Sequence, residues 1–230
     1  MLYDEAAVRE NLRNRDGKRV FFLRKGDQLT SSARDYLTRE RIPILPAEQA
    51  AVKRYRLPGG GYLEEKPEHM THLHGDVLVP KDHPRIRFRG KLDALEAELI
   101  QCQLADPALL EPVGQILDLA RKILRCEVLE EPLAFDKLCG LTPQELRRHS
   151  HFPQDYYGQP HFMPSAADGP VMARLNRARC AVRETELAAA AAFRREDGTC
   201  GREDILRALN RMSSMLYILM IRQKSGGNPS

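Results

Sequence analysis

The stretch that decides the fold covers residues 174–223 and reads RLNRARCAVRETELAAAAAFRREDGTCGREDILRALNRMSSMLYILMIRQ. It predicts two long helices separated by a polar break at Asp197–Gly201. The second helix carries an apolar stripe at helical spacing, formed by Leu206, Leu209, Leu216 and Leu219. The apolar sides of both helices therefore belong to the core of a helical protein.

The polar side of the first helix holds a charged group of residues. Arg179, Arg183 and Glu186 follow one another at i, i+4 and i+7 and so share one face. Two arginines one turn apart repel each other unless an anion lies over them. The alternative is a solvated face with one ion pair between Arg183 and Glu186, worth about 0.3–0.5 kcal/mol. Asn210 on the second helix likewise fits either a ligand site or the polar edge of a core helix.

Composition limits the class of partner. The 230 residues include 42% hydrophobic and 30% charged side chains, as expected for an ordinary globular protein. The net charge of +4 fits a polyanionic small molecule and is too small to indicate nucleic acid. Aromatic residues are sparse and Trp is absent, which argues against a surface that stacks bases. We expect no nucleic-acid partner.

The cysteines and the N-terminus predict the compartment. The five cysteines are dispersed, include no C-x-x-C pair and are expected to be reduced thiols; they are Cys102, Cys126, Cys139, Cys180 and Cys200. The N-terminal segment is charged and has no apolar signal core, and no stretch approaches 18 apolar residues. These features predict a soluble cytoplasmic protein with no membrane partner.

Four regions are expected along the chain. Residues 1–46 form a small α/β cap, 47–68 a linker, 69–224 a helical domain and 225–230 a disordered tail. The cap is predicted to be strand–helix–strand, with strands at Val20–Leu23 and Ile42–Leu45 and a helix that begins after Thr30 and runs to about Arg39.

The glycine run Gly59–Gly61 lies within the expected linker. It lacks the G-x-x-x-x-G-K-[ST] frame and the preceding strand of a phosphate-binding loop, so it is interpreted as a flexible turn.

The helical domain has clear start signals. One helix begins at Pro84 after a cap at Asp82 or His83, a second after Asp106, and a third after Thr142 with a capping box to Glu145. Its core positions recur at helical spacing at Phe88, Leu92, Leu95, Leu99, Leu109, Val113, Ile116, Leu117, Ala120 and Ile123. Residues 151–170 are predicted to be loop. The expected fold is mainly α, an up-and-down bundle of four or five helices with the small cap.

Histidines crowd residues 69–83, an expected polar and irregular loop. His69, His72, His74 and His83 could hold a metal in principle, but no Cys and no i, i+4 pair on a helix supports them. The alternatives are solvated histidines, or a loop whose amides wrap an anion together with Lys81. We assign no metal site.

Three motifs taken together, over residues 67–223, resemble the ATP-dependent cobalamin adenosyltransferases of the helical-bundle type. The R-x-x-x-R-x-x-E signature is matched by Arg179, Arg183 and Glu186. The L-N-R-x-S motif is matched by residues 209–213. The K-D pair at Lys81–Asp82 is followed by G-x-x-D-x-L at residues 90–95.

Within that family the chain is most similar to the ethanolamine-utilisation branch. The similar runs are LTSSARDYLTRERIPI, KPEHMTHLHGDVLVPKDHPRIRFRGKLD and EPLAFDKLCGLTPQELRRHSH. The chain departs from the branch in having no Cys in the linker, where many members carry a CCxxC metal motif. It also has Ser214 where the wider family often has Asp.

The resemblance implies transfer of the 5′-deoxyadenosyl group of ATP to cob(I)alamin, with release of triphosphate. Lys81, Arg179 and Arg183 would bind the phosphates with Mg²⁺, and the amides of Thr71, Gly75 and Asp76 would cradle them. Glu186 and Asn210 would orient the nucleoside or the arginines.

The resemblance also implies an oligomer and a corrinoid pocket. Asp93 would pair with Arg179 of a neighbouring subunit, in a homo-oligomer expected to be a trimer. Phe162, with Met163 beside it, would form the apolar wedge that excludes the lower cobalt ligand.

The expected partners are ATP, a corrinoid and a cobalamin reductase, and the product would supply ethanolamine ammonia-lyase. Location in or on a bacterial microcompartment is compatible with that branch. The alternative from another class is a non-catalytic cobalamin or nucleotide escort, or a microcompartment-associated interaction protein. A P-loop transferase is disfavoured because the Walker motif is missing.

Overall fold

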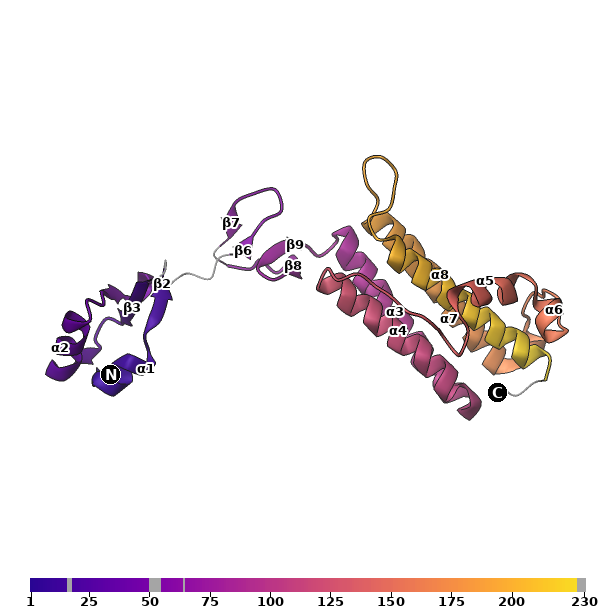
Figure 1. The fold of residues 1–230 in the computed structure, drawn as a ribbon, viewed down its shortest axis with the longest axis horizontal. Helices are drawn as coiled ribbons and strands as arrows, with labels where there is room; N and C mark the ends of the chain where they lie inside the picture. The colour runs from indigo at the N-terminus through magenta and orange to yellow at the C-terminus, as the bar shows by residue number, and fades with distance from the viewer. Residues whose placement is uncertain (16–17, 50–54, 64, 227–230) are drawn as a thin grey trace. The chain divides into compact units, whose positions relative to one another are not determined.

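A computed structural model describes residues 1–15, 18–49, 55–63 and 65–226 (Figure 1). The chain forms two compact units, Met1–Lys66 and Pro67–Ser230. The expected domain boundaries stay predictions, and the two units are described in turn.

The N-terminal unit is a small α/β fold. Strand β3 (Lys18–Leu23) pairs antiparallel with β2 (Arg13–Arg15) and parallel with β5 (Ile44–Pro46). Helix α2 (Ser31–Arg39) lies between β3 and β5 in sequence, and its N-cap Thr30 accepts a hydrogen bond from the Ala33 amide. The remaining elements are β1 (Leu2–Tyr3), α1 (Glu5–Glu10) and β4 (Gln28–Leu29).

The glycine run forms a hairpin turn. After the 3₁₀ helix η1 (Ala47–Gln49), strands β6 (Tyr55–Arg56) and β7 (Tyr62–Leu63) pair antiparallel. The Gly60 amide donates to the Leu57 carbonyl at 3.0 Å. Gly60 and Gly61 have φ values of 94° and 88°, which L side chains disfavour. The turn interpretation is confirmed, although residues 50–54 and 64 of the expected linker lie outside the described residues.

The histidine-rich stretch forms a β-hairpin, so the expected irregular loop is wrong. Strands β8 (Met70–His74) and β9 (Val77–Pro80) pair antiparallel around Gly75. Val77, Leu78 and Val79 are all buried. This apolar run is only three residues long and lies between Asp76 and Pro80, which hid the strand in the sequence.

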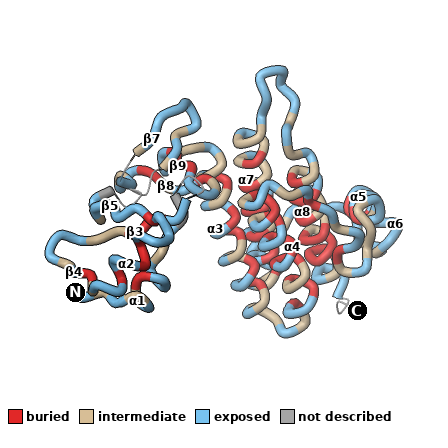
Figure 2. Tube along the Cα trace, turned by 60° about the vertical axis from the view of Figure 1, so that its left-hand side comes forward, coloured by how far each residue is buried: buried red, intermediate tan, exposed pale blue. Residues whose placement is uncertain are grey.

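Four long helices make the bundle. They are α3 (Pro84–Ala105), α4 (Leu110–Val128), α7 (Gly169–Ala192) and α8 (Glu203–Lys224), and the 3₁₀ helix η2 (Pro107–Leu109) leads into α4. Helix α3 packs against α4 and α7, and α7 packs against α8. Figure 2 shows buried residues along the facing sides of these helices. The predicted mainly α bundle is confirmed.

The helix starts agree with the sequence signals. The His83 ring accepts a hydrogen bond from the Arg85 amide and caps α3, while Asp106 caps η2. The predicted core positions of α3, from Phe88 to Leu99, are completely buried. Because each cap and stripe is local in sequence, both could be recognised without tertiary information.

Two further helices close one end of the bundle. Helix α5 (Pro143–His151) begins with the predicted capping box and packs against α8. The stretch predicted to be loop contains α6 (Pro153–Tyr157) and the 3₁₀ helix η3 (Ala166–Asp168), so that prediction holds only between them. Pro153 in the first turn of α6 and Gly158 in a left-handed conformation after it delimit this short helix.

The ends of the described chain complete the fold. The turn from α7 to α8 contains an isolated bridge between Arg194 and Cys200. Ser225 and Gly226 follow α8, and the rest of the expected disordered tail, residues 227–230, lies outside the described residues. Among the helices that the structure describes, none combines the length and apolarity needed to cross a membrane.

Candidate functional site

A cleft of about 860 Å³ lies over α7 and α8. It is bounded by the C-terminal end of α5 and by the extended segment 161–164. Its lining residues are Ser150, His151, His161, Phe162, Met163, Pro164, Asn176, Arg179, Arg183, Glu186, Asn210, Ser213, Ser214, Tyr217 and Met220. The structure thus brings six predicted site residues together: Arg179, Arg183, Glu186, Asn210, Phe162 and Met163.

The arginines of α7 fall into two groups. Arg174 donates to Gln101 at 2.8 Å, and Arg177 bonds to Glu98 at 3.0 Å, so both are tied to α3. Arg179 and Arg183 point instead into the cleft, where neither has a carboxylate within ion-pair distance among the described residues. Two neighbouring guanidinium groups without a counter-charge form an anion-binding surface.

Glu186 is held by the opposite helix. The Asn210 side-chain amide donates a hydrogen bond of 3.1 Å to Glu186 Oε1. The ion pair from Arg183 to Glu186, which the solvated-face alternative required, is not formed between these described residues. Glu186 therefore faces the cleft as an acceptor that is oriented by α8.

The other wall of the cleft is aromatic. Tyr217 on α8 stacks with His161 at 5.8 Å and with Phe162 at 6.2 Å between ring centroids. The Arg179 guanidinium lies 5.3 Å from the centre of the Tyr217 ring, in cation–π contact. Phe162 is half-buried against the core, whereas Met163 is 90% exposed. Cationic and apolar surfaces therefore meet at Tyr217.

A second cationic group lies beside the cleft. Burial lowers the pKa of Arg211, which follows Asn210, and the nearby Arg147 and Arg207 lower it further. Burial is the larger cause of this lowering, and the smaller contribution of Arg147 and Arg207 shows that these positive charges lie close to Arg211.

The predicted phosphate cradle lies elsewhere in the bundle unit. Thr71, Gly75 and Asp76 belong to the β8–β9 hairpin and do not line the cleft. Lys81 follows β9 and forms an ion pair of 2.9 Å with the exposed Glu68. One copy of the chain therefore does not bring these residues to the arginine pair.

A buried carboxylate anchors this hairpin to the bundle. Glu127 of α4 is fully buried and accepts hydrogen bonds of 2.5 Å from both Arg85 and Arg89 of α3. Arg89 also donates to the Leu73 carbonyl at 2.7 Å. Arg85 reaches the exposed Glu130 at 2.8 Å, which lowers the pKa of that carboxyl. The charge network links the hairpin to the first turns of α3.

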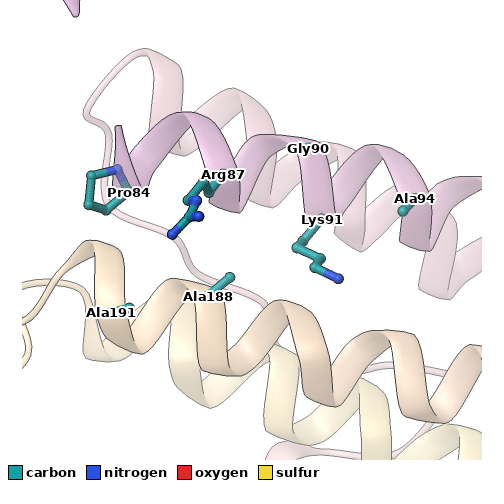
Figure 3. Close-up of a pocket in the computed structure, with 7 residues that line it drawn as sticks. All are labelled: Pro84, Arg87, Gly90, Lys91, Ala94, Ala188 and Ala191. Atoms are coloured by element: carbon teal, nitrogen blue, oxygen red, sulfur yellow. The ribbon is translucent and has the colours of Figure 1, made fainter. Parts of the chain in front are cut away.

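Asp93 lies on an exposed side of α3, outside the cleft. A separate groove of about 550 Å³ runs nearby between α3 and α7 (Figure 3). Gly90 of the predicted motif lines it with small residues, and Arg87 and Lys91 project beside them. Lys91 is paired with Glu184 at 2.8 Å, so the groove offers less free charge than the cleft.

The histidines have separate structural contacts. His72 bonds to the Gly75 carbonyl at 3.1 Å, His74 lies 4.0 Å from Glu130, and His83 caps α3. Within the described ranges, no three His, Cys, Asp or Glu side chains converge as metal ligands. The five cysteines are free thiols, and burial raises the pKa of Cys102 and Cys139 to about 12, which disfavours their thiolates.

Among the cleft residues that the sequence did not reveal are His161, Asn176 and Tyr217. Asn176 precedes Arg179 by three positions, and Tyr217 follows Asn210 by seven, so helical spacing could have placed both. His161 lies in an extended segment without periodicity. The aromatic and proline-rich composition around it was the available signal.

The structure is a helical bundle with a cleft in which two arginines, without an ion-pair partner among the described residues, lie beside an aromatic wall. A family model described as cobalamin adenosyltransferase matches residues 61–223. The chain belongs to the cobalamin adenosyltransferase family, and the resemblance in its motifs is confirmed.

Two relatives extend this comparison. The chain is 41% identical over 160 residues to the corrinoid adenosyltransferase EutT of Salmonella typhimurium and 39% identical over 160 residues to EutT of Escherichia coli K12. Each alignment covers 68% of this chain and 59% of the relative, so the chain spans less than two thirds of these proteins. No solved structure matches.

Proposed function

We propose that the protein transfers the 5′-deoxyadenosyl group of ATP to cob(I)alamin, forming adenosylcobalamin and triphosphate. Membership of the family and similarity to corrinoid adenosyltransferases support this activity. The observation that carries the proposal is the cleft itself, where Arg179 and Arg183 face the segment that bears Phe162 and Met163. An anionic and an apolar substrate can meet there.

The arginines would act on the leaving group. The reduced cobalt of the substrate supplies an electron pair to C5′, a cobalt–carbon bond forms, and the bond from C5′ to the triphosphate oxygen breaks. Triphosphate leaves with about four negative charges, and fixed cations along its oxygens stabilise that charge as it develops. Arg179 and Arg183 supply two of these cations. The step moves no proton, so the site needs no general base.

Glu186 and Asn210 would orient the nucleoside. Their hydrogen bond fixes the Glu186 carboxylate as an acceptor for a hydroxyl or amine of the substrate. Holding C5′ in line with the incoming cobalt is the main catalytic contribution that such positioning can make. Phe162 and Met163 would provide the apolar surface that keeps the lower cobalt ligand away.

The predicted phosphate cradle would come from another copy of the chain. Thr71, Gly75, Asp76 and Lys81 lie outside the cleft of their own chain. A neighbour in a homo-oligomer, proposed to be a trimer, could complete the site with them, while Asp93 pairs with Arg179 across the boundary. Mg²⁺ would be held mainly by the phosphate oxygens and water rather than by a cage of protein ligands.

We propose a wider setting from the resemblance to the ethanolamine-utilisation branch. A cobalamin reductase would supply cob(I)alamin, and the product would serve ethanolamine ammonia-lyase. We propose a cytoplasmic location, with or without attachment to a microcompartment.

Anaerobic incubation with ATP, Mg²⁺ and chemically reduced cobalamin tests the activity. The corrin spectrum should change from that of cob(I)alamin to that of adenosylcobalamin, and triphosphate should appear in equal amount. Arg183→Ala should lower the rate about 100-fold or more, because a cation on the leaving group is lost.

Arg174→Ala is the matched control, because Arg174 lies on the same helix but bonds to α3. It should keep the wild-type rate. Binding of both substrates without turnover in the wild-type protein would instead identify an escort. A wild-type rate in Arg183→Ala would exclude the proposed site.

A further inference from the structure

His161 bridges two helices at the edge of the cleft. Its Nδ1 lies 2.9 Å from the Tyr217 hydroxyl of α8, and its Nε2 lies 3.1 Å from the His151 carbonyl at the end of α5. The His161 and Tyr217 rings are nearly parallel, with an interplanar angle of 9°. Both ring nitrogens are thus engaged within the protein.

The partners define the hydrogen bonds of His161. A carbonyl oxygen can only accept, so Nε2 carries the proton that it donates to His151. In the neutral imidazole, Nδ1 is then an acceptor, and the Tyr217 hydroxyl donates to it. His161 therefore donates one hydrogen bond to α5 and accepts one from α8.

The His161 side chain links to the bundle a segment, residues 159–164, that has few other hydrogen bonds. Residues 159–164 belong to no helix or strand, and no backbone–backbone hydrogen bond involves them among the described residues. Pro160 and Pro164 have no amide hydrogen to donate. Phe162 adds apolar contact with Tyr217, while the neighbouring Met163 is exposed. The side chain of His161 thus supplies the directional contacts that fix this segment.

We propose that His161 is a positioning residue that sets the place of Phe162 and Met163 at the cleft through the Tyr217 hydroxyl and the His151 carbonyl. The inference rests on the proposed function in assigning Phe162 and Met163 to the corrinoid. Tyr217 also contacts the Arg179 guanidinium through its ring. The same ring therefore fixes the position of the apolar segment relative to the cationic surface.

The first measurement does not depend on activity. Backbone order parameters of the full chain, from 15N relaxation, should be lower at His161, Phe162 and Met163 in His161→Leu than in the wild type, whereas those of α7 should be unchanged. His161→Gln should restore most of the order, because its amide can both donate to a carbonyl and accept from a hydroxyl. Unchanged order parameters in His161→Leu would overturn the proposal.

The second measurement separates the two substrates. His161→Leu should raise KM for cob(I)alamin about 5- to 10-fold, the loss expected for one or two hydrogen bonds, and leave KM for ATP within about twofold. Tyr217→Phe removes one of the two bonds and keeps the ring, so it should have a smaller effect in the same direction. The double variant should be no worse than His161→Leu. Equal rises in both KM values would point to general loosening of the fold and contradict the proposal.

The chain provides a matched control. His149 Nδ1 lies 2.8 Å from the Tyr157 hydroxyl, a pair of the same chemistry between α5 and α6 that does not line the cleft. Tyr157→Phe should leave both KM values and the order parameters of residues 161–163 unchanged. If the wild type itself does not adenosylate cobalamin, the proposed function fails, while the relaxation experiment still decides whether His161 holds the segment.

Discussion

Asn210 and Glu186 form a hydrogen bond of 3.1 Å between α8 and α7, inside the cleft. The bond joins the two signature motifs, which are 24 residues apart in the chain, into one arrangement. It leaves the guanidinium groups of Arg179 and Arg183 free of the nearest carboxylate on their own helix. The hydrogen bond therefore connects the two motifs directly across the cleft.

Replacing Asn210 should weaken nucleotide binding. In Asn210→Ala the carboxylate of Glu186 loses its donor and is free to turn toward Arg183, which would compete with the phosphates. We expect KM for ATP to rise about 10- to 100-fold, as for one lost hydrogen bond to a charged group. Steady-state kinetics with the double variant Asn210→Ala/Glu186→Gln test the coupling, since additive effects of the two changes would show that the bond is irrelevant.

Mixing two inactive variants should restore activity if sites are shared between subunits. Lys81→Ala removes a cation beside the hairpin, and Arg183→Ala removes a cation in the cleft. A site that takes its hairpin from an Arg183→Ala subunit and its cleft from a Lys81→Ala subunit contains both cations. Random reassembly of a cyclic oligomer at equal amounts should regenerate about a quarter of the sites. The adenosylation rate after joint unfolding and refolding measures this. No recovery, when each variant alone refolds to the native oligomer, would place each site within one subunit.

Removing Glu127 should destabilise the bundle. Glu127→Ala leaves the guanidinium groups of Arg85 and Arg89 half-buried without their shared partner, and breaking a buried pair in this way costs about 3–5 kcal/mol. Glu130→Ala removes an exposed partner of Arg85 and should cost at most about 1 kcal/mol. Chemical denaturation at neutral pH compares the two. Similar losses in both variants would mean that burial of Glu127 is not the source of its effect.

Asp168 should make stability depend on acidity. The ion pair with Lys224, followed by hydrogen bonds from Ser165, lowers the pKa of Asp168 from 3.8 to about 2. A group with a depressed folded-state pKa stabilises the fold above its unfolded pKa, and that contribution is lost as the pH falls from about 4 to about 2. The difference in melting temperature between wild type and Asp168→Asn should therefore shrink over this window. A constant difference from pH 5 to pH 2 would exclude the linkage.

The bundle could be predicted because its signals are local. The side chains of Asp106 and Thr142 each cap a helix by accepting a hydrogen bond from an amide two or three residues later. The apolar stripe from Phe88 to Leu99 repeats within a single helix. The β8–β9 hairpin could not be predicted from the sequence, because the buried Val77–Val79 run is too short to show a period. The residue that anchors the hairpin, Glu127, also lies far away in the sequence, on α4. Burial of that glutamate depends on two arginines that are about 40 residues away in sequence.

The cleft was predicted in part for the same reason. Arg179, Arg183 and Glu186 share a helix face, so their proximity follows from the helical period alone. The contact between His161 and Tyr217 spans 56 residues and depends on how the segment after α6 folds back on α8. The aromatic and proline-rich composition marks this segment, but no spacing in the sequence predicts that it folds back on α8. The separation of the hairpin residues from the cleft is equally a property of tertiary structure.

The division of arginines along α7 has a consequence for the ligand-free protein. Within one chain, Arg179 and Arg183 repel each other by roughly 0.2–0.5 kcal/mol, and no carboxylate of the same chain, among the described residues, forms an ion pair with either. The proposed contact of a neighbour's Asp93 would reach Arg179 alone. A polyanion laid across both groups would relieve the repulsion, and binding to the folded state alone adds about 2.7 kcal/mol at a hundredfold excess over Kd. Any polyanion that fits the cleft should therefore raise the melting temperature of the protein. This rise should occur without a corrinoid and without turnover.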